Sequence, residues 1–376
     1  MRKPLLAAVL AAGVAVTHGA SAAELNDMSW DDIVAQAKEE GEVTFFSWWA
    51  EEWWRTAAQQ FEDETGIEVN VIIGDTGPTL NKLLAEKDRD EGTIDVIHFG
   101  GSATKTIMDA SLLHPNIQDI VPGADKLDPK LSAVQEGVDV KGHVIPVYRN
   151  QTGLLYNPDR VSSPPQSWDE LVAFIAENPN QFAFTDPTKG GSGQAMVQTA
   201  LFNVLNDADR YEGDTELDEA KVADWDQVWA WFNDIEDEVI ITASNFDSIE
   251  RLNQGEVSLV VAWDDDTSIA LKKGTLSPAN KLYIPEMGLP GGGDTLGVVG
   301  NAPNKAAGLA FIAYLVRPEV QTQMNQMIGS YLARTDVAGQ SELIPEEQRQ
   351  QFGTGWVPAP YKAHFAKEFV ANVLQQ

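Results

Sequence analysis

The strongest chemical signal in the sequence is a tryptophan followed directly by three aspartates, Trp263-Asp264-Asp265-Asp266. The tryptophan ends an apolar run that is typical of a strand, so the aspartates fall on the turn after it. An indole face attracts cations, and carboxylates accept charge-assisted hydrogen bonds from ammonium groups. The stretch therefore indicates contact with a cationic amine through Trp263, Asp264 and Asp265. Sugar hydroxyls suit the same groups, and Asp266 could instead cap a helix that starts at Thr267.

A second aromatic cluster lies near the start of the chain, where four tryptophans fall within seven residues. Ser47, Trp48 and Trp49 come directly after an apolar run that predicts the first strand. Ligands of α/β lobes sit beyond the carboxyl ends of the strands, so we expect these residues to face a ligand. Trp53 and Trp54 lie a helical turn further on, and at least one of them is expected to pack inward. Core packing of the whole cluster is the alternative.

Two smaller candidates also follow predicted strands or connections. Gly101 and Ser102 come after the strand predicted at 94–99, where glycine allows close backbone approach and the amides lead into a helix. A simple tight turn is the alternative. Tyr148 lies where the chain is expected to pass from one α/β unit to the next, so it is a candidate wall of the binding site.

The glycine-rich loop Lys189–Gly193 opens a helix predicted from Gln194. Free backbone amides and the helix dipole favour an anion at such a position, with the hydroxyls of Thr188 and Ser192 as further donors. The spacing lacks the GxxxxGK[ST] pattern of a nucleotide-binding loop. A mobile lip without a ligand is the alternative interpretation.

Strand and helix patterns alternate through most of the chain. Val43–Phe46, a helix through Glu64, and Glu68–Ile73 predict strand, helix and strand. The pattern continues to Phe99, and a second run includes strands at 181–185 and 257–263. This alternation predicts the α/β class, with doubly wound sheets in two lobes.

The expected lobes are joined by crossovers near Pro146–Asn150 and Ala262–Asp266. Lobe 1 is predicted to comprise residues 24–147 plus 267–325, and lobe 2 residues 148–266 plus 326–376. Bending at the crossovers would close the two lobes on a ligand.

Residues 1–23 are typical of a cleavable secretory signal, with a basic start, an apolar stretch to Val16 and small residues at 20–23. No later segment approaches about 20 consecutive apolar residues, so we expect no membrane anchor. The chain has no cysteine, which excludes disulfides, thiolate chemistry and a lipid-modified cysteine. We therefore expect a soluble monomer in a Gram-negative periplasm.

The chain is strongly acidic, with 57 Asp and Glu against 26 Lys and Arg and a formal charge of −31. Loss of Arg2 and Lys3 with the signal would bring the charge to about −33. Such a field argues against nucleic acid or anionic lipid as a partner. Acidity spread over a whole surface is commonly an adaptation for solubility, so it does not by itself define a pocket.

Five stretches, taken in order, resemble the extracellular solute-binding proteins of ABC importers, in a family 1-like form. They are GEVTFFSWWAEEWWRTAAQQFEDETGIEVNVI (41–72), TIDVIHFGG (93–101), VIPVYRNQTGLLYNPDRVSSPPQSWDELVAF (144–174), LNQGEVSLVVAWDDD (252–266) and GLAFIAYLVRPEVQTQMNQMIGSYLAR (308–334). The resemblance covers nearly all of the chain after residue 23. It implies the two-lobed periplasmic-binding-protein fold, a ligand between the lobes, and delivery to an inner-membrane permease driven by a separate ATPase.

Features of several branches of that family occur together. GEVSLVVAWDDD, with SNFDSIERL (244–252) upstream, is similar to the polyamine-binding branch, in which a tryptophan and nearby acids hold an amine. FSWW followed by FEDETGIEV is similar to the sugar-binding branch. FTDPTKGGSGQAM (184–196) is similar to branches that take up iron complexes, phosphonates or thiamine. The leading hypothesis is a polyamine or quaternary ammonium ligand, followed by a carbohydrate and then a phosphonate or other anion.

The sequence shows no catalytic or metal-binding constellation. The histidines after residue 23 lack the HExxH spacing, and Gly191-Ser192-Gly193 lacks the full GxSxG pattern. We expect a binding protein with no catalytic residues, no metal and no cofactor. A secreted glycoside-active enzyme that uses paired carboxylates is the alternative from a different functional class.

Overall fold

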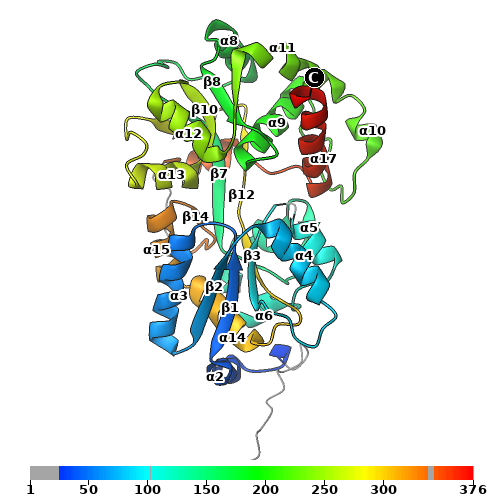
Figure 1. The fold of residues 1–376 in the computed structure, drawn as a ribbon, viewed down its shortest axis with the longest axis vertical. Coiled ribbons are helices and arrows are strands. Elements are labelled where there is room, and N and C mark those ends of the chain that lie inside the picture. The colour runs from blue at the N-terminus through cyan, green and yellow to red at the C-terminus, as the bar shows by residue number, and fades with distance from the viewer. Residues whose placement is uncertain (1–24, 102, 338–342, 376) are drawn as a thin grey trace, which may run out of the picture.

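The computed structural model describes residues 25–101, 103–337 and 343–375, so the expected signal segment and Ser102 lie outside the described residues. The chain forms two α/β lobes that lie one above the other along its longest axis (Figure 1). The long strand β7 (Tyr148–Tyr156) runs from the lower lobe into the upper one. This two-lobed α/β architecture confirms the predicted fold class. In the part of the chain that the structure describes, no helix is both long and apolar enough to cross a bilayer.

The first lobe is built on a five-stranded sheet with the order β2-β1-β3-β13-β6. Strand β1 pairs in parallel with β2 and β3, whereas β13 pairs antiparallel with β3 and β6. The strands are β1 (Glu42–Ser47), β2 (Glu68–Ile73), β3 (Val96–Phe99), β6 (Ile145–Pro146) and β13 (Thr295–Val298). A separate hairpin is formed by β4 (Val134–Gln135) and β5 (Val138–Asp139).

The second lobe is built on an eight-stranded sheet whose main order is β15-β12-β7-β10-β8-β9. Strand β10 pairs antiparallel with β7 and in parallel with β8, and β11 and β14 also pair with β7. The other strands are β8 (Phe182–Thr185), β9 (Val239–Thr242), β10 (Leu259–Trp263), β11 (Lys281–Tyr283), β12 (Leu289–Gly292), β14 (Tyr331–Leu332) and β15 (Gly353–Thr354).

Helices cover both sheets (Figure 1). Those whose buried side chains join the first core, or that lie beside it, are α2 (Trp30–Glu40), α3 (Glu51–Thr65), α4 (Thr76–Glu86), α5 (Ala103–Asp109), α6 (Ile117–Ile120), η1 (Ala124–Lys126), α7 (Pro129–Ala133), α14 (Lys305–Leu315) and α15 (Pro318–Ile328). Those of the second lobe are α8 (Trp168–Glu177), α9 (Gly191–Val204), α10 (Glu219–Val222), α11 (Asp226–Asp234), η2 (Glu236–Glu238), α12 (Asn245–Gln254), α13 (Asp264–Lys272), α16 (Glu346–Phe352), α17 (Ala359–Phe369) and η3 (Val370–Leu374).

Helix α3 shows how the local sequence sets these elements. Buried positions recur along one face at Trp53, Trp54, Ala57, Ala58 and Phe61, the spacing of a helix that packs on a sheet. Gly66 ends the helix in the left-handed conformation with a φ of 78°, which glycine adopts without a Cβ clash. The prediction that at least one of Trp53 and Trp54 packs inward is confirmed, since both are buried.

The buried apolar side chains form two cores. The first draws on residues 25–148 and 296–333, and the second on 154–289 and 344–373. Leu276 and Leu282 pack in the second core, so the chain returns to the first lobe after β12 rather than after Asp266. Ile328 and Ala333 in turn pack in the first core. On this packing we propose that the lobes divide near 148, 293 and 335, with the segment 262–266 inside the second lobe.

Candidate functional site

A cavity of about 2010 Å³ lies between the two lobes and is lined by residues from both. The first lobe contributes residues that follow β1 and β3, the hairpin β4–β5, and Asp294. The second lobe contributes the starts of α9, α12 and α13 and the segment 353–356. Residues that follow β1, β3, β8 and β10 thus meet at one place, as expected for loops beyond the carboxyl ends of parallel strands.

The wall on the first lobe centres on the carboxylate of Asp294. The Trp48 indole Nε1 donates a hydrogen bond to Oδ2 of Asp294 at 3.1 Å, and the Tyr148 hydroxyl donates to the same oxygen at 2.7 Å. The Trp49 indole Nε1 donates to the Tyr148 hydroxyl at 2.6 Å. Nε2 of His98 lies 3.3 Å from Oδ2 of Asp294. Burial by itself raises the pKa of Asp294, but His98 and these hydrogen-bond donors outweigh burial and lower it, so this carboxylate is ionised at neutral pH.

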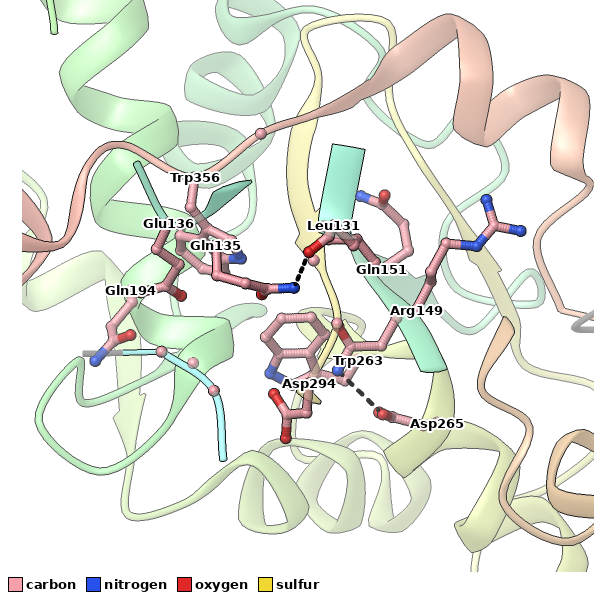
Figure 2. Close-up of a pocket in the computed structure, with 18 of the residues that line it drawn as sticks. Leu131, Gln135, Glu136, Arg149, Gln151, Gln194, Trp263, Asp265, Asp294 and Trp356 are labelled. Atoms are coloured by element: carbon pink, nitrogen blue, oxygen red, sulfur yellow. Dashed lines mark hydrogen bonds between the residues drawn. The ribbon is translucent and has the colours of Figure 1, made fainter. Parts of the chain in front are cut away.

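The wall on the second lobe centres on Trp263, whose indole lies against the glycine-rich loop. A Cβ added at Gly191 would come within 2.8 Å of Cζ2 of Trp263, so this close packing requires glycine. The Trp356 ring lies 6.0 Å from the Trp263 ring, centroid to centroid, at an interplanar angle of 41°. Both indoles border the cavity (Figure 2). The glycine-rich loop Lys189–Gly193, which the sequence suggested as an anion site, therefore packs against the indole of Trp263.

The three aspartates occupy the first turn of α13, where successive side chains point about 100° apart. Asp264 is fully buried and does not border the cavity, and its Oδ1 accepts hydrogen bonds from the Gln151 and Asp265 amides at 3.0 and 2.9 Å. Asp265 borders the cavity, and its Oδ2 accepts from Nδ2 of Asn150 at 3.2 Å. Asp266 also borders the cavity. The helix begins at Asp264, so the alternative in which Asp266 caps a helix from Thr267 is not what the structure shows.

Burial raises the pKa of all three aspartates, because ionised carboxylates are costly in a poorly solvated site. The pKa of Asp265 rises to about 6, since burial and the negative charge of Asp294 outweigh its hydrogen bonds from Asn150 and the Asp266 amide. The negative charge of Asp265 further raises the pKa of Asp264 and Asp266. A cation that entered the cavity would therefore stabilise the ionised forms.

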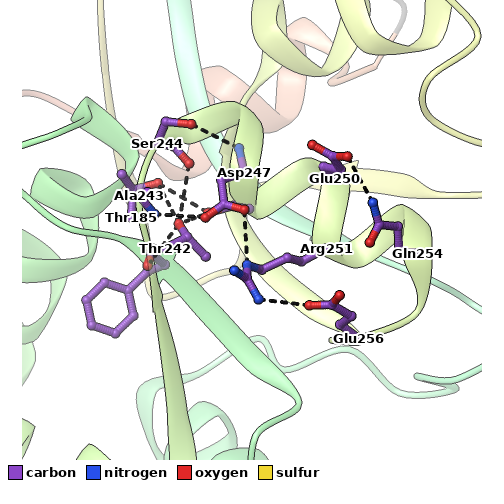
Figure 3. A network of polar contacts seen from close by, with 11 residues as sticks. Thr185, Thr242, Ala243, Ser244, Asp247, Glu250, Arg251, Gln254 and Glu256 are labelled. Atoms are coloured by element: carbon purple, nitrogen blue, oxygen red, sulfur yellow. Dashed lines mark hydrogen bonds and ion pairs between the residues drawn. The ribbon is translucent and has the colours of Figure 1, made fainter.

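A polar network fixes the start of α12, which borders the cavity near Asp266 (Figure 3). The Ser244 hydroxyl caps the helix by accepting from the Asp247 amide at 3.1 Å. The guanidinium of Arg251 donates to Oδ1 of Asp247 at 3.0 Å. Oδ1 of Asn245 accepts from the Ser192 hydroxyl at 2.8 Å, which ties the starts of α12 and α9 together.

Residues 56–348 match the family model described as "Bacterial extracellular solute-binding protein". The chain belongs to this family. The resemblance stated from the sequence is confirmed, and the solute-binding protein is placed in a family of binding components rather than enzymes.

Curated relatives match this solute-binding protein over most of its length. The spermidine/putrescine-binding periplasmic protein of Salmonella typhimurium is 23% identical over 377 residues, which is 96% of this chain and 97% of that protein. The putrescine-binding periplasmic protein SpuD of Pseudomonas aeruginosa is 24% identical over 339 residues, covering 87% and 83% of the two chains.

Solved structures share the two-lobed fold. The spermidine/putrescine substrate-binding protein PotD of Streptococcus pneumoniae superposes with a TM-score of 0.68 at 16% identity, covering 89% of this chain and 98% of that one. The periplasmic binding protein AfuA of Actinobacillus pleuropneumoniae, solved with fructose-6-phosphate, gives a TM-score of 0.66 at 16% identity, with 89% and 99% covered. At such identities the likeness shows the fold alone.

The cavity of this solute-binding protein brings together six of the residues expected at the site, namely Trp48, Trp49, Gly101, Thr188, Trp263 and Asp265. Four others, Ser47, Tyr148, Ser192 and Asp264, are buried and do not border it. Ser47 donates its hydroxyl hydrogen bond to the Trp49 carbonyl at 3.0 Å, so its polar group is used within the lobe. The Thr188 hydroxyl likewise donates to Oδ1 of Asp186 at 2.7 Å.

Sequence reasoning missed several residues that border the cavity. Asp294 follows three glycines, and a Cβ at Gly293 would come within 2.1 Å of the Tyr148 carbonyl oxygen, so the glycine run marks a close backbone approach. Trp356 stands alone in the C-terminal segment, where no predicted strand precedes it. In both cases the available signal was a glycine directly before the residue, Gly293 before Asp294 and Gly355 before Trp356. Neither residue followed a strand that the sequence pattern predicts, so neither was expected at the site.

Proposed function

We propose that this protein binds a small cationic amine, a polyamine or quaternary ammonium compound, between its lobes. One observation carries this proposal. Carboxylates from opposite walls, Asp294 of the first lobe and Asp265 of the second, border the same cavity as the indoles of Trp48 and Trp263. Ionised carboxylates and indole faces are the groups that bind ammonium in proteins, through charge-assisted hydrogen bonds and cation–π attraction.

The electrostatics of the two walls favour a cation. Asp294 and Asp265 lie close enough that the charge of Asp294 raises the pKa of Asp265. An ammonium group between them would replace this repulsion by attraction to both lobes. The curated relatives named above are described as binding spermidine and putrescine, which are amines of this kind.

The arginines on the cavity wall are paired within the protein, which weakens the case for an anion. Nε of Arg349 lies 3.0 Å from Oε2 of Glu346, and Nη1 of Arg149 lies 3.7 Å from Oε1 of the same glutamate. The hydroxyls of Thr188 and Ser192, expected as donors to an anion, are engaged by Asp186 and Asn245.

In the proposed mechanism, the two lobes close by bending where the chain crosses between them. A ligand can contact both walls only in the closed form. These additional contacts stabilise the closed form relative to the open form. The closed protein would then dock, in the periplasm, on a permease with its ATPase. The binding step needs no cofactor or covalent chemistry.

A ligand screen tests the proposal. We expect 1,4-diaminobutane to raise the midpoint of thermal unfolding, because a ligand at 100 times its Kd stabilises the folded state by about 2.7 kcal/mol. The uncharged analogue 1,4-butanediol is the matched control and should leave the midpoint unchanged. Stabilisation by a sugar or a phosphonate, with none by any amine, would reject the proposal. Recovery of the amine unchanged after incubation distinguishes binding from turnover.

Amine affinity is expected to fall as the pH drops through about 6. The pKa of Asp265 is raised to about 6, so its carboxylate is ionised above that pH and protonated below it. If one proton is linked, affinity falls about tenfold for each pH unit below the pKa. Isothermal titration calorimetry from pH 5 to pH 8 measures this dependence, and a flat profile would contradict it.

The stability of the free protein should change in the opposite direction. Because the pKa values of Asp264, Asp265 and Asp266 are raised, the folded chain binds protons more tightly than the unfolded chain. Their contribution to the free energy of unfolding is therefore largest at acidic pH and is lost as the pH rises through the folded pKa values. Asp265→Asn is the matched control, since it removes the Asp265 part of both pH dependences.

A further inference from the structure

We propose that Lys362 fills a second ammonium subsite of the cleft and thereby limits the length of the amine that the protein accepts. This inference rests on the proposed function. Lys362, Glu136 and Trp356 all border the cavity that holds Trp263 and Asp265. The ammonium of Lys362 lies 2.6 Å from Oε1 of Glu136 and 3.6 Å from the centroid of the Trp356 ring. Its surroundings are thus the carboxylate and indole face that would bind a ligand ammonium.

The carboxylate of this subsite is fixed by the hairpin between β4 and β5. Glu136 and Gly137 form its two-residue turn, both with positive φ, 48° and 77°, as a type I′ turn requires. The carbonyl of Glu136 accepts a hydrogen bond from the Ala359 amide at 3.0 Å, at the first residue of α17. The hairpin of the first lobe is therefore docked on the second lobe at the point where Lys362 enters the cavity.

Within the described part of the chain, the carboxylate of Glu136 has acceptor capacity left over. Its side chain is only 9% exposed, and among the residues that the structure describes its buried Oε2 has no hydrogen-bond partner. Removal of Lys362 would leave this carboxylate buried without a counter-charge, which is an unfavourable state. An ammonium group from outside would relieve it.

The Lys362 subsite is the neighbour of the proposed amine site. The Trp356 and Trp263 rings are 6.0 Å apart, and Lys362 contacts both Glu136 and Trp356 (Figure 2 shows the cavity that these residues line). A linear triamine held at Trp263 and Asp265 would extend its far ammonium group toward Glu136, beyond the reach of a shorter diamine. In the wild-type protein the charge of Lys362 already occupies that place and repels a second cation. The protein should therefore favour a diamine over a longer triamine.

Isothermal titration calorimetry with 1,4-diaminobutane and spermidine at pH 7.5 tests this inference. Lys362→Met should raise spermidine affinity about tenfold or more, because the freed carboxylate and indole bind the third ammonium. Diamine affinity should change less than about threefold, since that ligand does not reach Glu136. Lys367→Met is the matched control, because Lys367 is an exposed lysine on the same helix that also borders the cavity. It should leave the ratio of the two affinities unchanged.

Two further variants test the same subsite if Lys362→Met does not fold stably. The double variant Glu136→Gln/Lys362→Met has no unpaired buried charge, and it should lose the gain in spermidine affinity. Lys362→Arg keeps the charge and should retain the wild-type preference. A gain that survives in the double variant, or a loss of preference in Lys362→Arg, would overturn the inference. So would equal losses for both amines in Lys362→Met. Absence of amine binding by the wild-type protein would instead overturn the proposed function itself.

Discussion

The Asp265→Asn variant is expected to bind 1,4-diaminobutane about 30 to 700 times more weakly than the wild-type protein. Asp265 is 3% exposed, and it is the carboxylate of the second lobe that faces Asp294 across the cavity. Removing one member of a buried, hydrogen-bonded charge pair costs about 2–4 kcal/mol, and each 1.4 kcal/mol is a factor of ten in affinity. Asparagine keeps the size of the side chain, so the loss would report on charge.

Calorimetry at pH 7.5, well above the pKa of about 6 for Asp265, measures this loss. The matched control is Asp159→Asn, which removes one negative charge from an exposed position after β7. It should leave the affinity unchanged, because exposed charges beyond a Debye length of about 8–10 Å are screened. The free Asp265→Asn protein should be at least as stable as the wild type, since a costly buried charge is gone. Wild-type affinity in this variant would exclude Asp265 from the binding site.

The Trp54→Ala variant is expected to lose about 3–5 kcal/mol of unfolding free energy, the usual cost of deleting a large buried side chain. Trp54 is fully buried, and its ring lies 4.9 Å from that of Phe45 and 5.0 Å from that of His98. The sheet cannot collapse into the space of a lost indole without moving β1. Urea unfolding of the free protein measures the change.

Trp48→Ala is the matched control for this loss, because Trp48 lies in the same tryptophan cluster but is 46% exposed on the cavity wall. Its removal deletes one hydrogen bond to the ionised Asp294, worth about 1.5–3 kcal/mol, and little buried apolar surface. Its main expected effect is weaker amine binding. If Trp54→Ala were as stable as the wild type, or Trp48→Ala as unstable as Trp54→Ala, the division of the cluster into core and binding wall would be wrong.

Local patterns in the sequence predict much of this fold. The predicted strands at 43–46 and 68–73 correspond to β1 and β2, and the helix expected through Glu64 corresponds to α3. These elements are set by residues close together in the chain, through apolar periodicity and the glycine that ends the helix. The residues that follow the strands were predicted in the same way, so Trp48 and Trp263 were found as cavity residues.

On the proposed division of the lobes, the chain returns to the first lobe later than the sequence pattern predicts, after β12 rather than after Asp266. In the structure the three aspartates begin α13, and Leu276 and Leu282 pack in the second core. Whether a strand that follows such a helix joins one sheet or another depends on pairing partners far away in the chain. Here the partner of β11 is β7, more than a hundred residues earlier.

Patterns in the sequence were enough to predict the α/β lobes, the family, and the indole and carboxylate side chains found at the cavity. Which members of each cluster border the cavity depends on how distant parts of the chain pack together. Asp264 and Asp265 are adjacent in sequence, yet one helical step points the first into the protein and the second at the cleft. Asp294 becomes part of the wall through Trp48, 246 residues away. The cavity forms only where the two lobes lie together, and the position of one lobe against the other depends on contacts between residues far apart in the chain. A local sequence pattern does not contain that information.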